Sequence, residues 1–190
     1  MSAFSTTVVG SALGVVGLTR FQQGDLAGAE KYYRYALAAV EGSGVARHST
    51  NLAARRADLA NAQLMQGRWH DALELFEQRD RALRSDTAQF KRTGSRHVGW
   101  AYALHKTGQS ERAAQIANGL AATLLKRPVP NRWYIAQVRG VLGMALAASG
   151  KTAEALKAYQ ESVPDLIRRD QDDATAEASG YWRAFWQRVI

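Results

Sequence analysis

Apolar residues recur along this chain every three or four positions, in segments long enough to form amphipathic helices. Short polar turns separate the segments, and four of the turns hold a Gly that is followed five residues later by an Ala. The four pairs are Gly24/Ala29, Gly67/Ala72, Gly108/Ala113 and Gly150/Ala155. Successive turn glycines stand 43, 41 and 42 residues apart. Because self-similarity at a fixed period is the signature of a repeat protein, the pattern predicts an all-α stack of helical hairpins.

Each turn Gly is expected to end one helix, since Gly adopts left-handed backbone angles without a steric penalty. We therefore expect hairpins at about residues 10–42, 48–85, 90–126 and 131–169, in a single domain over residues 1–190. In the fourth hairpin, Leu142, Leu146 and Leu156 are all expected to be buried. A terminal helix is expected at 173–190, with an apolar stripe of Trp182, Phe185, Trp186 and Val189.

The composition favours helical structure and excludes several kinds of chemistry. The chain has 190 residues, only three prolines, no cysteine and a formal net charge of +8. The absence of cysteine excludes disulfides and thiolate catalysis within the chain. The apolar start has no basic leader, and no segment approaches the 18 apolar residues of a membrane span. We expect a soluble protein of the cytoplasm that makes no membrane contact.

The pattern resembles the tetratricopeptide repeat (TPR) family over about residues 10–169. In that family the first helix carries a bulky residue followed by Gly or Ala, seven residues before the turn Gly. The corresponding pairs are Val16-Gly17, Leu59-Ala60, Trp100-Ala101 and Leu142-Gly143. The second helix carries the Ala and an aromatic residue four positions later, which Tyr33, Phe76 and Tyr159 supply, whereas Ala117 replaces it in the third repeat. The resemblance implies a right-handed α-solenoid of four hairpins plus a C-terminal helix.

The period of about 42 residues looks like the long-helix variety found in kinesin light chains and in bacterial regulators. The segment from Gly150 to Ile190 also resembles the repeat arrays that precede CHAT domains, which are caspase-like proteases. This resemblance rests on the overall residue pattern of two segments, SVPDLIRRD and YWRAFWQRVI, rather than on a motif. The chain stops in the middle of an apolar pattern, so we expect a fragment of a larger bacterial protein.

The TPR resemblance also implies a concave groove lined by the first helix of each hairpin. The groove positions carried over from the family are Leu18, Phe21, Asn61, Leu64, Val98, Tyr102, His105, Gln137 and Met144. This lining is mostly small or apolar, which suits an extended peptide or an amphipathic helix. Gly14 and Ala57 stand where chaperone-binding relatives would place Lys and a further basic contact. We therefore do not expect a carboxylate clamp.

A basic stretch surrounds the connection between the second and third hairpins. Its members are Arg79, Arg81, Arg84, Lys91, Arg92 and Arg96. Such a cluster could attract nucleic acid or an acidic partner, although a solvated loop is the alternative that we favour.

Catalytic and cofactor sites are not expected. Residues 145–152 read ALAASGKT, one residue away from a phosphate-binding loop, but they continue a helix rather than follow a strand. The four histidines lack the spacing of a metal site, so we expect neither metal nor cofactor.

The leading hypothesis is a non-catalytic module that binds a protein or peptide in the groove. Two alternatives remain open: the regulatory region of a CHAT-type protease, and a nucleic-acid binder that uses residues 79–96. Self-association through Trp182, Phe185 and Trp186 is a further hypothesis.

Overall fold

The computed structural model describes residues 3–88, 90, 97–167 and 180–190. Within these ranges the chain is helical and contains no β-strand. The helices are α1 (Ala3–Gln22), α2 (Leu26–Gly42), α3 (Thr50–Met65), α4 (Trp69–Arg84), α6 (Val98–Lys106), α7 (Ser110–Leu125), α8 (Arg132–Ala148), α9 (Thr152–Ile167) and α10 (Gly180–Val189). They fall into two compact units, Met1–Ser95 and Arg96–Ile190, here called unit 1 and unit 2.

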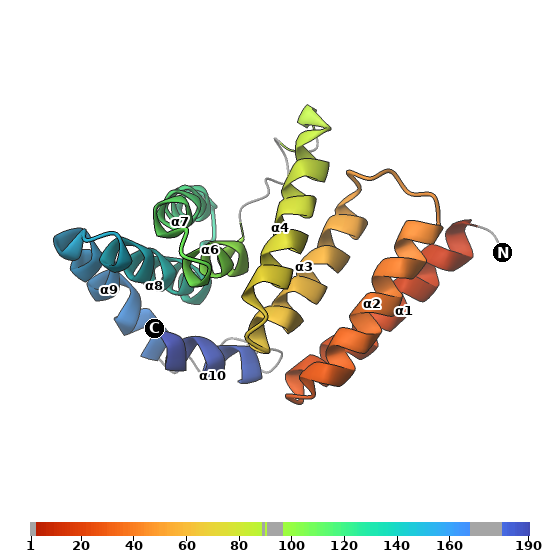
Figure 1. Ribbon diagram of the computed structural model, residues 1–190, viewed down its shortest axis with the longest axis horizontal. Helices are drawn as coiled ribbons and strands as arrows, with labels where there is room; N and C mark the ends of the chain where they lie inside the picture. Colours follow the sequence, from red (N-terminus) through yellow and green to blue (C-terminus); the bar gives the residue numbers. More distant parts are fainter. Residues whose placement is uncertain (1–2, 89, 91–96, 168–179) are drawn as a thin grey trace. The chain divides into compact units, whose positions relative to one another are not determined.

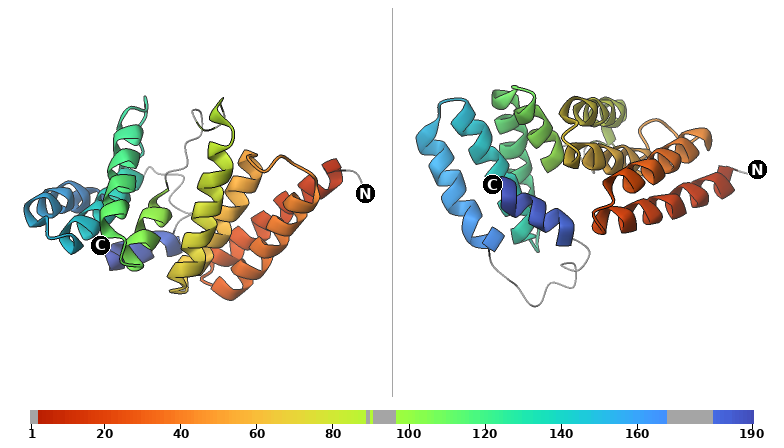
Figure 2. Two further views of the ribbon diagram at one scale, coloured as in Figure 1. Left: turned by 45° about the horizontal axis from the view of Figure 1, so that its top comes forward. Right: turned by 60° about the horizontal axis from the view of Figure 1, so that its bottom comes forward.

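Each unit contains two consecutive helical hairpins. In unit 1, α1 pairs with α2, α3 pairs with α4, and α2 packs against α3 to join the hairpins. In unit 2, α6 pairs with α7 and α8 with α9, while α7 and α6 both pack against α8. Figure 2 shows the antiparallel course of these pairs from two further directions. The predicted all-α architecture of TPR-like hairpins is confirmed.

The four predicted turns are built alike. Gly24, Gly67, Gly108 and Gly150 all have left-handed backbone angles, with φ of 80°, 77°, 83° and 76°. In each turn the N–H of the residue after the Gly donates to the carbonyl five residues earlier, at 2.8–3.0 Å. This bond satisfies a helix-end carbonyl that would otherwise lack a partner. The prediction that these glycines end the first helices is therefore confirmed.

Small residues let the paired helices approach closely. A Cβ added at Gly17 would lie 2.6 Å from the Tyr33 ring, and one at Gly143 would lie 2.9 Å from the Tyr159 ring. Real Cβ atoms essentially never come this close to a neighbour, so both positions need Gly unless the ring moves. The alanines that follow the turns are buried as well: Ala29, Ala72, Ala113 and Ala155. In the first and fourth hairpins a Gly on the first helix thus packs directly against an aromatic ring on the second.

A buried carboxylate joins the two hairpins of unit 1. Glu30 on α2 accepts hydrogen bonds from Arg34 Nη2 at 2.6 Å, Gln66 Nε2 at 2.9 Å and Arg68 Nη1 at 2.7 Å. Burial by itself would raise the pKa of Glu30, but the bonds from Gln66, Arg34 and Arg68 outweigh it and lower that pKa to about 2. Because Gln66 and Arg68 flank the turn after α3, this network ties the first hairpin to the second.

One boundary and one buried face differ from the sequence prediction. α1 begins at Ala3 rather than near residue 10. Leu156 is 57% exposed, because the buried seam of α9 runs through Ala155, Ala158, Ser162 and Leu166 instead. One step along a helix turns a side chain by about 100°, which moves Leu156 off that seam. The part of the predicted terminal helix before Gly180 lies outside the described residues. A single domain over the whole chain stays a prediction.

The described helices were also compared with the requirements of a membrane span. None of them combines the length and the apolar character that crossing a bilayer requires.

Candidate functional site

The sequence-predicted groove residues lie on four helices, two in each unit. In unit 1, α1 carries Leu18 and Phe21, and α3 carries Asn61 and Leu64; in unit 2, α6 carries Val98, Tyr102 and His105, and α8 carries Gln137 and Met144. Five of them are buried in the chain: Phe21, Leu64, Val98, Tyr102 and Gln137. Leu18 is 46% exposed, and Asn61, His105 and Met144 are half-buried. Partner binding at these positions stays a prediction.

In unit 2 the terminal helix covers one of these residues. The Tyr102 ring on α6 meets Phe185 edge-on at a centroid distance of 5.8 Å and Trp186 at 5.2 Å. Phe185 and Trp186 also meet each other edge-on at 5.2 Å, and Trp186 is fully buried. Edge-to-face pairs at these distances stabilise by about 0.5–1.5 kcal/mol beyond the area that they bury. A residue predicted to bind a helix thus already holds one, α10.

The end of α10 requires a glycine on α8. A Cβ at Gly140 would lie 2.6 Å from Ile190 Cγ2, so Ile190 occupies the space that any other residue would need. We call Tyr102 and Gly140 together the α10 seat. The sequence analysis missed Gly140, because it stands outside the Gly/Ala pairs that mark the repeats. One feature of the sequence could have pointed to it: Gly140 lies in the interior of a helix. A Gly there costs about 1 kcal/mol of stability relative to Ala, so its presence suggests that a neighbour needs the space of the missing side chain.

Burial shifts the pKa values of two ionisable side chains of α6 in the direction that favours their neutral forms. Burial raises the pKa of Tyr102. Desolvation, assisted by the neighbouring charge of Lys106, lowers the pKa of His105. Gln137 is fully buried, and its amide makes no hydrogen bond with any described residue. The seat therefore favours aromatic and aliphatic side chains over charged ones.

In unit 1, an arginine from α3 fills the space beside Gly14 on α1. A Cβ at Gly14 would overlap the guanidinium of Arg55, which pairs with Asp58 at 3.2 Å. Burial raises the pKa of Asp58 to about 6, although the charge of Arg55 opposes the rise. This cation is therefore already matched by a carboxylate on its own helix.

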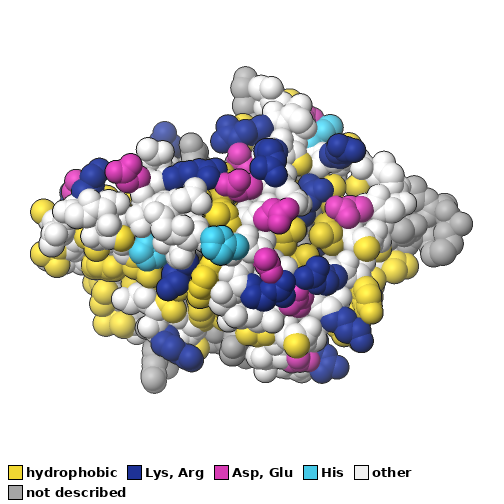
Figure 3. Space-filling model, viewed as in Figure 1, with side chains coloured by type: hydrophobic (Ala, Val, Ile, Leu, Met, Phe, Trp, Pro, Cys, Tyr) yellow, Lys and Arg dark blue, Asp and Glu magenta, His cyan; other side chains and the backbone are white. Residues whose placement is uncertain are grey.

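Two described arginines of the predicted basic stretch, Arg81 and Arg84, are accompanied by acids on α4. Arg81 lies 3.6 Å from Glu77 and Arg84 lies 2.7 Å from Asp80, while the Arg84 guanidinium also stacks over Phe90. Arg79 is half-buried. Figure 3 shows Lys and Arg side chains interspersed with Asp and Glu on the face that it presents. Lys91, Arg92 and Arg96 lie outside the described residues, so nucleic-acid binding by the whole stretch stays a hypothesis.

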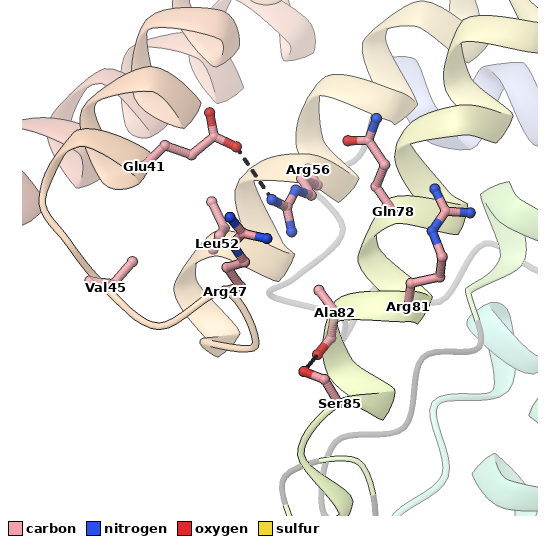
Figure 4. Close-up of a pocket in the computed structure, with 9 residues that line it drawn as sticks. All are labelled: Glu41, Val45, Arg47, Leu52, Arg56, Gln78, Arg81, Ala82 and Ser85. Carbon is pink, nitrogen blue, oxygen red and sulfur yellow. Dashed lines mark hydrogen bonds and ion pairs between the residues drawn. The ribbon is translucent and has the colours of Figure 1, made fainter.

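Unit 1 also contains a pocket that the sequence analysis did not predict (Figure 4). It has a volume of about 700 Å³ and lies among the end of α2, the connection to α3, the start of α3 and the last turns of α4. Three arginines line it, Arg47, Arg56 and Arg81, with one carboxylate, Glu41. In the part of the chain that the structure describes, no group of three or more His, Asp or Glu could hold a metal ion.

Comparison with known proteins supports the fold. No family model matches the sequence, and no curated protein does. Among solved structures, the kinesin light chain-like protein of Podosopora anserina, described as having nearly identical TPR-like repeats, matches with a TM-score of 0.59. The match covers 82% of this chain and 74% of that one, at 19% sequence identity. The helical hairpins of this chain are therefore TPR-like repeats.

Proposed function

We propose that this chain is a non-catalytic protein-interaction module whose α10 seat binds an amphipathic helix. The observation that carries the proposal is the docking of α10 itself. The sequence pattern nominated Tyr102 as a ligand contact, and the aromatic side chains of Phe185 and Trp186 lie against it. A partner helix with the same aromatic and aliphatic anchors would occupy the same seat in place of α10.

Energetic considerations favour a helix over an extended peptide. Trp186 and Ile190 are four residues apart, so they lie on one helical face and can reach Tyr102 and Gly140 together. Buried aromatic side chains remove about 150–250 Å² each from water and dominate the energetics of interfaces. Binding to a preformed surface also limits the entropy lost on association. These features are typical of helix-in-groove recognition.

A peptide-exchange experiment tests the proposal. Trp186→Ala removes the main anchor of α10 and is expected to free the seat. A fluorescein-labelled peptide of residues 180–190 should then bind the variant with a Kd on the order of 10–100 μM, as measured by fluorescence anisotropy. The wild-type chain should bind at least ten-fold more weakly, because its own α10 competes at an effective concentration in the millimolar range.

Two second-site changes locate the binding. Adding Tyr102→Ala to the Trp186→Ala chain should abolish peptide binding, whereas adding Arg127→Ala, at an exposed position of unit 2, should leave it unchanged. Circular dichroism establishes that each variant is folded. If Trp186→Ala unfolds the chain, Phe185→Ala provides a milder change, since Phe185 is only half-buried. A folded variant that binds the peptide no better than wild type would contradict the proposal.

A further inference from the structure

The pocket of unit 1 collects more positive charge than its surroundings neutralise. Arg56 Nη2 donates to Glu41 Oε1 at 3.3 Å, and its side chain is only 12% exposed. Arg81 has Glu77 at 3.6 Å. Arg47 makes no hydrogen bond or ion pair with any residue that the structure describes. Three guanidinium groups from the α2–α3 connection, α3 and α4 thus line one pocket together with a single carboxylate (Figure 4).

The three arginines differ in how firmly they are held. Burial and the Glu41 bond fix Arg56 at the side of the pocket, whereas Arg81 is 66% exposed and Arg47 belongs to an exposed connection. A guanidinium presents five N–H donors in a planar fork that matches the oxygens of carboxylate and phosphate. An incoming oxyanion could therefore dock on Arg56 and draw Arg47 and Arg81 onto its remaining oxygens.

The rest of the lining indicates that the anion carries an organic group. Val45, Leu52 and Ala82 supply apolar surface beside the arginines. Ser85 Oγ donates to the Ala82 carbonyl at 2.7 Å and keeps its lone pairs for a donor on the ligand. The volume of about 700 Å³ lies within the range of small-molecule sites, which is about 300–1,000 Å³, and greatly exceeds that of a bare ion.

We propose that this pocket binds an oxyanion, phosphate or carboxylate, borne on a small apolar body. The principal alternative is purely structural. Basic side chains near a helix C-terminus stabilise the helix dipole, and Arg81 lies in the last turn of α4. In that case the arginines would stabilise unit 1 and bind no ligand. The two explanations predict different responses to added anions.

Titration of the full chain with defined probes distinguishes them. The probes are inorganic phosphate, phenyl phosphate and benzoate, with phenol as the uncharged control, and the arginine Nε–Hε signals are followed by NMR. We expect saturable shifts of the Arg47 and Arg56 signals with phenyl phosphate, and binding at least five-fold tighter than that of phosphate. Comparison of phenyl phosphate with benzoate tells which oxyanion is preferred. Absence of saturable binding by both organic anions would overturn the proposal.

Variants connect the binding to the pocket. Arg47→Ala should weaken phenyl phosphate binding about five-fold without loss of stability, because Arg47 is exposed and makes no bond with the residues that the structure describes. Arg56→Lys keeps the charge but removes the planar fork and should weaken binding to a similar extent. Glu41→Gln should strengthen it several-fold, since a competing carboxylate is removed.

The matched control is Arg127→Ala, which removes one exposed arginine of unit 2. It should leave the affinity unchanged. An equal loss in Arg127→Ala and Arg47→Ala would mean that only net charge attracts the anion, and the pocket would then be no site.

Discussion

Units 1 and 2 share one plan of paired helices, but different chemistry completes each of them. In unit 1 a charged network centred on Glu30 ties the two hairpins together across the turn after α3. In unit 2 an additional helix, α10, packs its aromatic residues on α6, and Ile190, which follows the helix, packs on α8. The comparison teaches that the turns and small residues of the repeat specify the hairpins, whereas the residues between them decide how the hairpins are held together.

Breaking the aromatic contacts of α10 in unit 2 should reduce stability more than breaking the charged network of unit 1. Trp186→Ala is expected to destabilise unit 2 by about 3–5 kcal/mol, the usual cost of truncating a fully buried Trp. Hydrogen exchange of the α6 and α8 amides measures the loss. Phe185→Ala, at a half-buried position of the same helix, should cost clearly less. Unchanged protection of α6 in Trp186→Ala would show that α10 contributes little to unit 2.

The charged network of unit 1 should respond to pH. The pKa of Glu30 is about 2 in the folded chain and about 4.5 in an unfolded one, so the carboxylate stabilises the fold above pH 4.5. That contribution should fade as the pH falls from 4.5 towards 2. Glu30→Gln should therefore cost about 2 kcal/mol at pH 7 and almost nothing near pH 2.

Urea unfolding of both proteins between pH 7 and pH 2 tests this expectation. Lys31→Gln, an exposed neighbour on α2, serves as the control and should run parallel to wild type. A Glu30→Gln penalty that stays constant with pH would indicate that packing, rather than charge, is what Glu30 provides.

Substitution of a turn glycine should have the smallest effect on stability, and the effect should be the same in both units. Gly67→Ala and Gly150→Ala each place a Cβ on a left-handed residue, which costs about 1 kcal/mol. Gly42→Ala is the control, because Gly42 lies in a right-handed helix end with open space around it. Thermal unfolding measures all three. A much larger loss at one of the two turns would show that the turns are not equivalent, contrary to their common hydrogen bonds.

The sequence alone determined the hairpins, their order and the residues at which they turn. These features depend on local constraints: only Gly takes a φ near +80° without penalty, and helical periodicity is a property of neighbouring residues. The apolar stripe of the terminal helix, which includes Phe185 and Trp186, could be predicted for the same reason. The prediction that Leu156 is buried was wrong, because an apolar residue next to a buried seam cannot be told from a residue of the seam by its type alone.

Only the tertiary structure decided which surfaces face each other. No local pattern indicates that Trp186 docks on Tyr102, that Gly140 makes room for Ile190, or that Arg47, Arg56 and Arg81 share a pocket. These relations join residues far apart in the chain. They depend on which of several apolar or charged faces pack together, and side-chain volume and charge in three dimensions settle that choice.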